Sequence, residues 1–429
     1  MKYKQINNLL FIKNRSNFIN RLKTNAIAIF QSNDEFPRSG DQNFPFKQNA
    51  DLFYLSGIDQ EQSILLLYPD CPNPLYREVL FLRQTNDHIK VWEGHKYTKE
   101  QASIVSGIKT VYWLSDFEQI LHNVIHYADH IYLNSNENDR YAHTVTYRDI
   151  RFINELKEKY PLHHYERVAP IMRDLRVIKS KTEVELTQTA CNITNDAFNR
   201  VLKFVKPGVS EYEIEAEIIH EFIKQRATGH GYTPIIASGN NANILHYVDN
   251  NQICNDGDLI LMDFGAEYAN YNADLTRTIP VNGKFSRRQK NVYNAVLNVL
   301  NEAKKLMVDG SLWNTYHEQV GEIMTEELIN LKLISITDVK NQNPSNPAYK
   351  KYFMHGTSHH LGIDVHDLAS RYTPFAAGNI LTCEPGIYIP EEGFGIRLEN
   401  DILITKDGNI DLMADIPIIA EEIEELMNA

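Results

Sequence analysis

Leu259-Ile260-Leu261-Met262-Asp263 is an apolar run that ends on a carboxylate, and Asp274-Leu275-Thr276-Arg277-Thr278 follows it across a short turn. An apolar run of this length bounded by polar residues is typical of a buried strand. The two aspartates are 11 positions apart (274 − 263), so a hairpin with its turn near residues 270–272 would bring both carboxylates to one place. Buried carboxylates are unfavourable unless they are paired or bind a metal ion. The stretch therefore predicts a strand hairpin that carries a metal site.

A second stretch repeats this arrangement near the end of the chain. Glu384 follows another short apolar run, and Glu399 lies within residues 395–405, which we expect to form one strand. Alternation along that strand places Arg397, Glu399 and Asp401 on the same face. Four carboxylates on two sheet interiors indicate a pair of divalent cations, because one carboxylate can bridge two metal ions.

A nitrogen ligand is expected from the segment Met354–His366, where histidines and glycines alternate at short intervals. His355, His359 and His360 lie close together there, which is unusual for a simple core segment. His246, which precedes the first hairpin, is another candidate.

Each predicted hairpin follows two predicted helices. The first pair covers Lys181–Phe204 and a second helix to about 225, which begins at a capping box formed by Ser210 and Glu213. The second pair covers Ser286–Met307 and Trp313–Leu331. Two halves with the order helix, helix, hairpin predict an α+β domain in which the helices lie over a common curved antiparallel sheet.

The first part of the chain has a different pattern. Short apolar runs at residues 26–30, 64–68, 79–82 and 130–133 predict buried strands, and helical spacing appears between them. Strands that alternate with helices indicate an α/β domain. We place the domain boundary near residue 172, which divides the chain into residues 1–172 and 173–429.

Composition narrows the class of function. The formal net charge is −13 with a pI of about 5.7, which disfavours nucleic acid and anionic membranes as partners. The four cysteines are far apart and fit reduced thiols. The N-terminus lacks the pattern of a secretory signal, and no stretch has the length of a membrane span. We therefore expect a cytoplasmic protein.

Residues 175–415 resemble the pita-bread metallopeptidases, which include methionine aminopeptidase, prolidase and Xaa-Pro aminopeptidase. The resemblance rests on the order of five residues, each in its own local context: Asp263, Asp274, His359, Glu384 and Glu399. The segments Asn49–Gly57 and Val91–Gly94 are similar to the N-terminal domain of aminopeptidase P, although Lys96 stands where an arginine is often found. The resemblance therefore implies an α/β N-terminal domain, a pita-bread catalytic domain and Xaa-Pro aminopeptidase activity through a metal-bridged hydroxide.

The resemblance also implies roles for individual residues. Asp263 would bind one metal ion and His359 the other, Asp274 and Glu399 would bridge them, and Glu384 would be both a ligand and the general base. His366 and His246 would stabilise the tetrahedral intermediate and help to protonate the proline nitrogen. The remaining residues would shape the substrate site or orient carboxylates: His355, Tyr388, Arg397, Thr276 and, from the N-terminal domain of a neighbouring subunit, Trp92.

The expected cofactor is a pair of divalent ions, with manganese favoured by the oxygen-rich ligands and cobalt or zinc possible. The expected partners are peptides with proline in the second position and further copies of the chain, as a dimer or tetramer. Two alternatives remain open from the residues alone. One is prolidase, which accepts only dipeptides, and the other is an inactive pita-bread protein that acts as a binding module.

Overall fold

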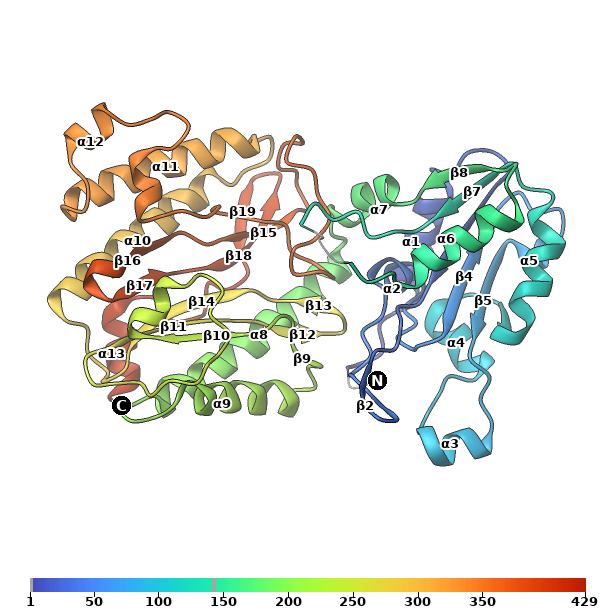
Figure 1. The fold of residues 1–429 in the computed structure, drawn as a ribbon, viewed down its shortest axis with the longest axis horizontal. Helices are drawn as coiled ribbons and strands as arrows, with labels where there is room; N and C mark the ends of the chain where they lie inside the picture. The colour runs from blue at the N-terminus through green and yellow to red at the C-terminus, as the bar shows by residue number, and fades with distance from the viewer. Residues whose placement is uncertain (1–2, 141–143) are drawn as a thin grey trace. The chain divides into compact units, whose positions relative to one another are not determined.

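The computed structural model describes residues 3–140 and 144–429, which form two compact units (Figure 1). One unit comprises residues 3–176 and the other residues 177–429.

The first unit is built on a six-stranded mixed sheet with the spatial order β6-β5-β4-β1-β7-β8. Its strands are β1 (Ala26–Gln31), β4 (Ser63–Leu67), β5 (Glu78–Leu82), β6 (Thr110–Trp113), β7 (His130–Leu133) and β8 (His164–Arg167). Strand β1 pairs in parallel with β7 and antiparallel with β4. A separate two-stranded ribbon consists of β2 (Pro37–Ser39) and β3 (Gln42–Asn43).

Helices cover both faces of this sheet. The helices of this unit are α1 (Leu9–Ile19), α2 (Ala50–Ser56), α3 (Asp87–Glu93), α4 (Lys99–Ser106), α5 (Phe117–Ile125), α6 (Arg148–Lys159) and α7 (Ala169–Arg176), of which α3 buries no residue and extends away from the sheet (Figure 1). Ile27 and Ile29 point to the face where Phe117 of α5 and Phe152 of α6 belong to the same core cluster. Phe30 points to the opposite face because side chains alternate along a strand, and it meets Phe18 of α1 at 5.2 Å between ring centroids.

The second unit has two halves of similar build, as Figure 1 shows. The first half contains α8 (Lys181–Phe204), α9 (Glu211–Lys224), β9 (Gly229–His230), β10 (Ile235–Ser238), β11 (Leu259–Phe264), β12 (Ala266–Tyr268), β13 (Tyr271–Asn272) and β14 (Leu275–Pro280). The second half contains α10 (Arg287–Leu306), α11 (Trp313–Asn330), α12 (Ile336–Lys340), β15 (Ile380–Cys383), β16 (Gly386–Ile389), β17 (Phe394–Arg397), β18 (Asn400–Thr405), β19 (Gly408–Asp411) and the C-terminal helix α13 (Ala420–Met427). This arrangement confirms the predicted fold class.

Local sequence explains where the helices of this unit begin. Ser210 and Glu213 form the predicted capping box of α9, with the Ser210 N–H donating to Glu213 at 2.8 Å. Ser286 caps α10 in the same way. No helix among residues 3–140 and 144–429 is long and apolar enough to cross a membrane.

Two expectations about the hairpins need correction. The turn of the first hairpin is at Ala269 and Asn270, both with positive φ, and Tyr271–Asn272 belongs to a strand. Residues 395–405 do not form one strand: β17 pairs with β16, whereas β18 pairs with β15 and β19. The break between them falls at Leu398 and Glu399, where Glu399 instead forms an isolated bridge with Thr276 of β14.

Candidate metal centre

Strand register explains how distant carboxylates come together. Asp263 on β11 is paired with Thr276 on β14, and Thr276 is bridged in turn to Glu399. These three residues therefore form a row across neighbouring backbones. Asp274 lies two residues before Thr276, on the same face of the chain.

His359 reaches the cluster from a segment that runs beside β15. The Thr382 N–H donates to the His359 carbonyl at 2.9 Å, and the Glu384 N–H donates to the Thr357 carbonyl at 2.9 Å. These bonds place the imidazole near two carboxylates: His359 Nε2 lies 3.3 Å from Asp274 Oδ2 and 3.8 Å from Glu384 Oε1. The structure thus brings all five expected ligands into one connected cluster.

Three of these residues already offer their ligand atoms to a common point. One atom each from Asp274, His359 and Glu399 lies within 4.8 Å of the others, and all three side chains are buried. The donor set is oxygen-rich with one imidazole, which suits manganese and also zinc or cobalt. The described residues therefore fit a divalent metal site at this position.

The pKa shifts of the clustered side chains also indicate a site for cations. Burial raises the pKa of Glu384 to about 7, and burial together with Asp274 and Glu384 raises the pKa of Glu399 well above its usual range. Burial alone would lower the pKa of His359, but its hydrogen bond to Asp274 and the charge of Glu384 raise it to about 9. The cluster therefore attracts positive charge, and bound cations would neutralise it in place of protons.

A phenol and a guanidinium hold the carboxylates in place. The Tyr232 hydroxyl donates to Asp263 at 2.6 Å and is 2.5 Å from Asp274 Oδ1. Arg397 forms an ion pair with Asp263 and donates to the Thr276 hydroxyl at 3.0 Å. Thr276 then donates to Glu399 at 2.6 Å. Ligand carboxylates with such partners have fixed orientations, which supports metal affinity.

The other predicted site residues lie at different depths. The ring of His366 meets that of His359 with centroids 4.4 Å apart, although His366 is exposed. His355 is 2.8 Å from the Tyr388 hydroxyl, to which Arg397 also donates at 2.9 Å. Burial lowers the pKa of His355 to about 3, with smaller contributions from Arg397, His317 and His246. His355 is therefore a neutral imidazole at the edge of the cluster.

Two predicted residues are not drawn into the buried cluster. His246 is exposed, and its proximity to the cluster is seen in a small lowering of the pKa of His355. Trp92 belongs to the first unit, where it lies on helix α3 with 76% of its surface exposed. Its role at a substrate site stays a prediction.

Sequence reasoning missed Tyr232 and underestimated Asp401. Tyr232 lies outside any regular element, so no periodic pattern singles it out. Asp401 accepts the N–H of Asp274 at 3.0 Å and lies 3.5 Å from the Cys191 thiol. Burial raises the pKa of Asp401 well above its usual range. The sequence pattern could have identified Asp401, because it was predicted to share a strand face with Arg397 and Glu399 and a third buried charge on that face needs a partner.

Comparison with known proteins shows the family of the chain. Residues 185–406 match metallopeptidase family M24, and residues 11–132 match the N-terminal domain of aminopeptidase P. The chain belongs to the aminopeptidase P group of family M24. Among members of this family, the Xaa-Pro aminopeptidase of Escherichia coli is 34% identical over 98% of this chain and 97% of its own length. That of Haemophilus influenzae is 32% identical over 97% of each chain.

Solved aminopeptidase P structures have the same fold along the whole chain. The Pseudomonas aeruginosa aminopeptidase PepP superposes with a TM-score of 0.90 at 30% identity, covering 99% of this chain and 98% of the other. A zinc-substituted E. coli aminopeptidase P in complex with product gives a TM-score of 0.88 at 31% identity, covering 99% of both chains. The fold of this aminopeptidase P family member is therefore shared over both of its units.

Proposed function

We propose that this chain is an Xaa-Pro aminopeptidase, which removes the N-terminal residue from peptides with proline in the second position. The observation that carries the proposal is the cluster of His359 with three buried carboxylates and the partly exposed Glu384, beside the neutral imidazole of His355 and the Tyr388 hydroxyl. Full-length similarity to Xaa-Pro aminopeptidases supports the same reaction.

We assign the ligands of two divalent ions to Asp263, Asp274, His359, Glu384 and Glu399, with manganese as the physiological metal. Bound at this position, the ions would polarise the scissile carbonyl and lower the pKa of a water molecule. The oxygens of Asp274 and Glu399 share one common point with His359 and would hold one ion there. The family resemblance further suggests that these two carboxylates would also contact the second ion.

Glu384 is proposed as the general base. A carboxylate at this position can accept a proton from an attacking water molecule and return it to the leaving group, which is what general acid–base catalysis requires. The Glu384 side chain also keeps partial exposure, so a substrate can reach it. Its neighbours His359 and His355 hold it from two sides at 3.8 and 3.7 Å.

The histidines around the cluster are proposed to handle the substrate. His366, which is exposed yet packs on His359, can donate a hydrogen bond to an oxyanion or to the leaving nitrogen. His246 would act with it. His355 and Tyr388 would form the wall against which the proline ring packs.

Proline selectivity has a physical basis in this setting. An Xaa-Pro bond has no N–H, and the pyrrolidine ring fixes the backbone before it, so ordinary peptidases bind it poorly. A wall of a neutral imidazole and a phenol offers a flat surface to the ring without requiring an N–H donor from the substrate.

Assembly and location also belong to the proposal. We propose a homo-oligomer in which Trp92 of one copy lines the substrate site of another, which would give its exposed ring an apolar contact. A cytoplasmic location is proposed from the composition alone.

The test is release of free arginine from Arg-Pro-Pro and from Arg-Pro after chelation and manganese reloading. Cleavage of the tripeptide at a rate equal to or above that of the dipeptide would support the proposal. Activity on Arg-Pro alone would indicate prolidase. If the metal-loaded chain cleaves neither peptide, the proposed activity is wrong, and an inactive pita-bread protein that acts as a binding module is favoured.

A further inference from the structure

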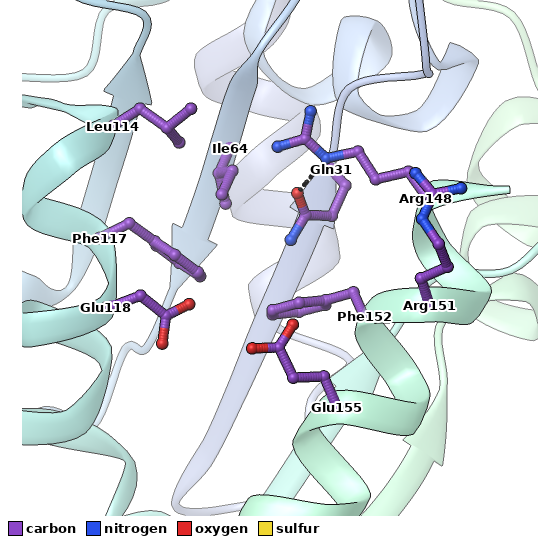
Figure 2. A pocket seen from close by; sticks show the side chains of 9 residues that line it. All are labelled: Gln31, Ile64, Leu114, Phe117, Glu118, Arg148, Arg151, Phe152 and Glu155. Atoms are coloured by element: carbon purple, nitrogen blue, oxygen red, sulfur yellow. Dashed lines mark hydrogen bonds between the residues drawn. The ribbon is translucent and has the colours of Figure 1, made fainter.

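The first unit contains a groove of about 380 Å³ between helices α5 and α6. Figure 2 shows the two helices as its walls and strands β1 and β4 as its floor. Nine residues line it: Gln31, Ile64, Leu114, Phe117, Glu118, Arg148, Arg151, Phe152 and Glu155. None of them belongs to the metal cluster of the second unit. The volume is within the range of small-ligand sites.

Arg148 is the unusual member of this lining. Its Nε donates to Gln31 at 2.9 Å and its Nη1 to the Ser32 hydroxyl at 3.2 Å, both neutral partners. No carboxylate of the described chain forms an ion pair with it, whereas nearby Arg151 is paired with Asp34. Burial lowers the pKa of Arg148.

A partly buried guanidinium has five N–H donors, and two neutral acceptors leave most of them free. Asp34, Asp149 and Glu35 raise the pKa of Arg148 through their charge, but none of them forms an ion pair with its guanidinium. The N–H groups that remain free therefore favour an anion that can accept two parallel hydrogen bonds. A carboxylate has that shape. Gln31 and Ser32 fix the Arg148 side chain in advance, which reduces the entropy lost on binding.

The far end of the groove has the opposite charge. Glu118 on α5 and Glu155 on α6 share one cation, Lys159, at 3.1 and 2.7 Å. Two carboxylates with one ammonium leave a net negative charge. Between the two ends, the rings of Phe117 and Phe152 lie 6.0 Å apart. Both are more than nine-tenths buried, and their remaining exposed edges form the apolar middle of the groove.

We propose that this groove binds a short peptide with free termini. The peptide carboxylate would meet Arg148, its ammonium would meet Glu118 and Glu155, and its apolar side chains would cover Phe117 and Phe152. A peptide fits better than a single amino acid, because the charges of an amino acid are on neighbouring atoms whereas those of the groove are at its two ends, as Figure 2 shows. The proposal does not depend on the peptidase activity.

The test is titration of Leu-Leu into the full, zinc-loaded chain, observed through the Ile64 δ1 methyl signal in a methyl-labelled sample. Ile64 lines the groove, so its signal reports on this site and not on the metal cluster. We expect a saturable shift with Leu-Leu. Leu-Leu-amide lacks the carboxylate and N-acetyl-Leu-Leu lacks the ammonium, and each should bind at least about tenfold more weakly.

Variants connect these losses to named residues. Arg148→Gln should weaken Leu-Leu binding at least about tenfold. In a double-mutant cycle, the variant chain should bind Leu-Leu and Leu-Leu-amide with equal affinity, because the partner of the carboxylate has been removed. Glu155→Gln, at an exposed position where folding is not at risk, should weaken binding of Leu-Leu but not of N-acetyl-Leu-Leu. Arg167→Gln is the control, because exposed Arg167 pairs with Glu137 outside the groove.

An Ile64 signal that does not move at millimolar Leu-Leu would overturn the proposal. So would equal affinity of the wild-type chain for Leu-Leu and Leu-Leu-amide, because Arg148 would then have no carboxylate to recognise. This second result is obtained on the wild-type chain and does not depend on the folding of any variant.

Discussion

Thr276 and Glu399 are joined twice, although 123 positions separate them (399 − 276). The Glu399 N–H donates to the Thr276 carbonyl at 3.1 Å, and the Thr276 hydroxyl donates to the Glu399 carboxylate at 2.6 Å. This double contact links the two halves of the second unit at the position where the carboxylates meet. Arg397 completes it by donating to the same hydroxyl.

The Thr276 hydroxyl should therefore control metal affinity. Thr276→Val keeps the shape of the side chain but removes the donor to Glu399 and the acceptor for Arg397. We expect metal affinity to fall about 10- to 100-fold, as for other partners of metal ligands. Calorimetric titration of the chelated chain with Mn²⁺ measures it. Thr278→Val is the matched control, because the Thr278 hydroxyl bonds to the backbone of Arg397 and not to a carboxylate of the cluster. Equal losses in both variants would contradict the assignment.

Tyr232→Phe should have a comparable effect for a different reason. The variant keeps the ring but removes the proton that Asp263 and Asp274 share. The two carboxylates would then repel each other more strongly and lose their fixed orientation. We expect metal affinity to fall by at least about tenfold with the fold retained. Metal titration together with circular dichroism checks this result, and an unchanged affinity would mean that the hydroxyl has no role in the metal site.

The stability of the chelated chain should decrease as pH rises. Glu384 has its pKa raised by burial from 4.5 to about 7, so the folded chain holds this proton more tightly than the unfolded chain. The contribution of this proton to the free energy of unfolding is complete below pH 4.5 and is lost as pH rises through 7. His359, with its pKa raised to about 9, acts in the same direction between pH 6.5 and 9.

Thermal melts between pH 6.5 and 9, with and without Mn²⁺, measure this dependence. The chelated chain should lose stability across the window, while the stabilisation by Mn²⁺ should increase because the ligands must lose protons to bind metal. Glu384→Gln should make the melting temperature of the chelated chain less dependent on pH at the low-pH end of this window. A chelated chain whose melting temperature rises with pH would show that the cluster does not hold these protons.

Lys179→Met should destabilise the second unit strongly. Lys179 and Asp367 form an ion pair of 2.8 Å with only 1% of each side chain exposed, and Asp367 lies next to His366. Removing the ammonium breaks this buried ion pair from one side, which typically costs about 3–5 kcal/mol. Urea unfolding measures the loss. The double variant Lys179→Met with Asp367→Leu should recover part of it, and a single variant as stable as wild type would contradict the prediction.

Local patterns predicted much of this molecule. Helix α8 begins and ends at the predicted residues, because its amphipathic spacing lies between a Ser180 cap and the Lys206-Pro207-Gly208 stop. Strands β1, β5 and β7 were predicted from apolar runs, whereas β8 was missed because its residues are half-buried or exposed and carry no such run. The site residues were reached mainly through their resemblance to a family, and their order along the chain made that resemblance specific.

The amino-acid sequence by itself predicted the α/β and α+β character of the two units and the helix caps, because each of these depends on residue type and spacing within a short segment. The five proposed ligands were predicted from their order along the chain, which resembles that of a known family. Only the tertiary structure decided that Tyr232 joins Asp263 to Asp274, that Asp401 lies behind Asp274, and that the chain breaks at Glu399 to reach Thr276. These contacts join segments that are far apart in the chain. Their partners are chosen by strand register and packing, which no local pattern encodes.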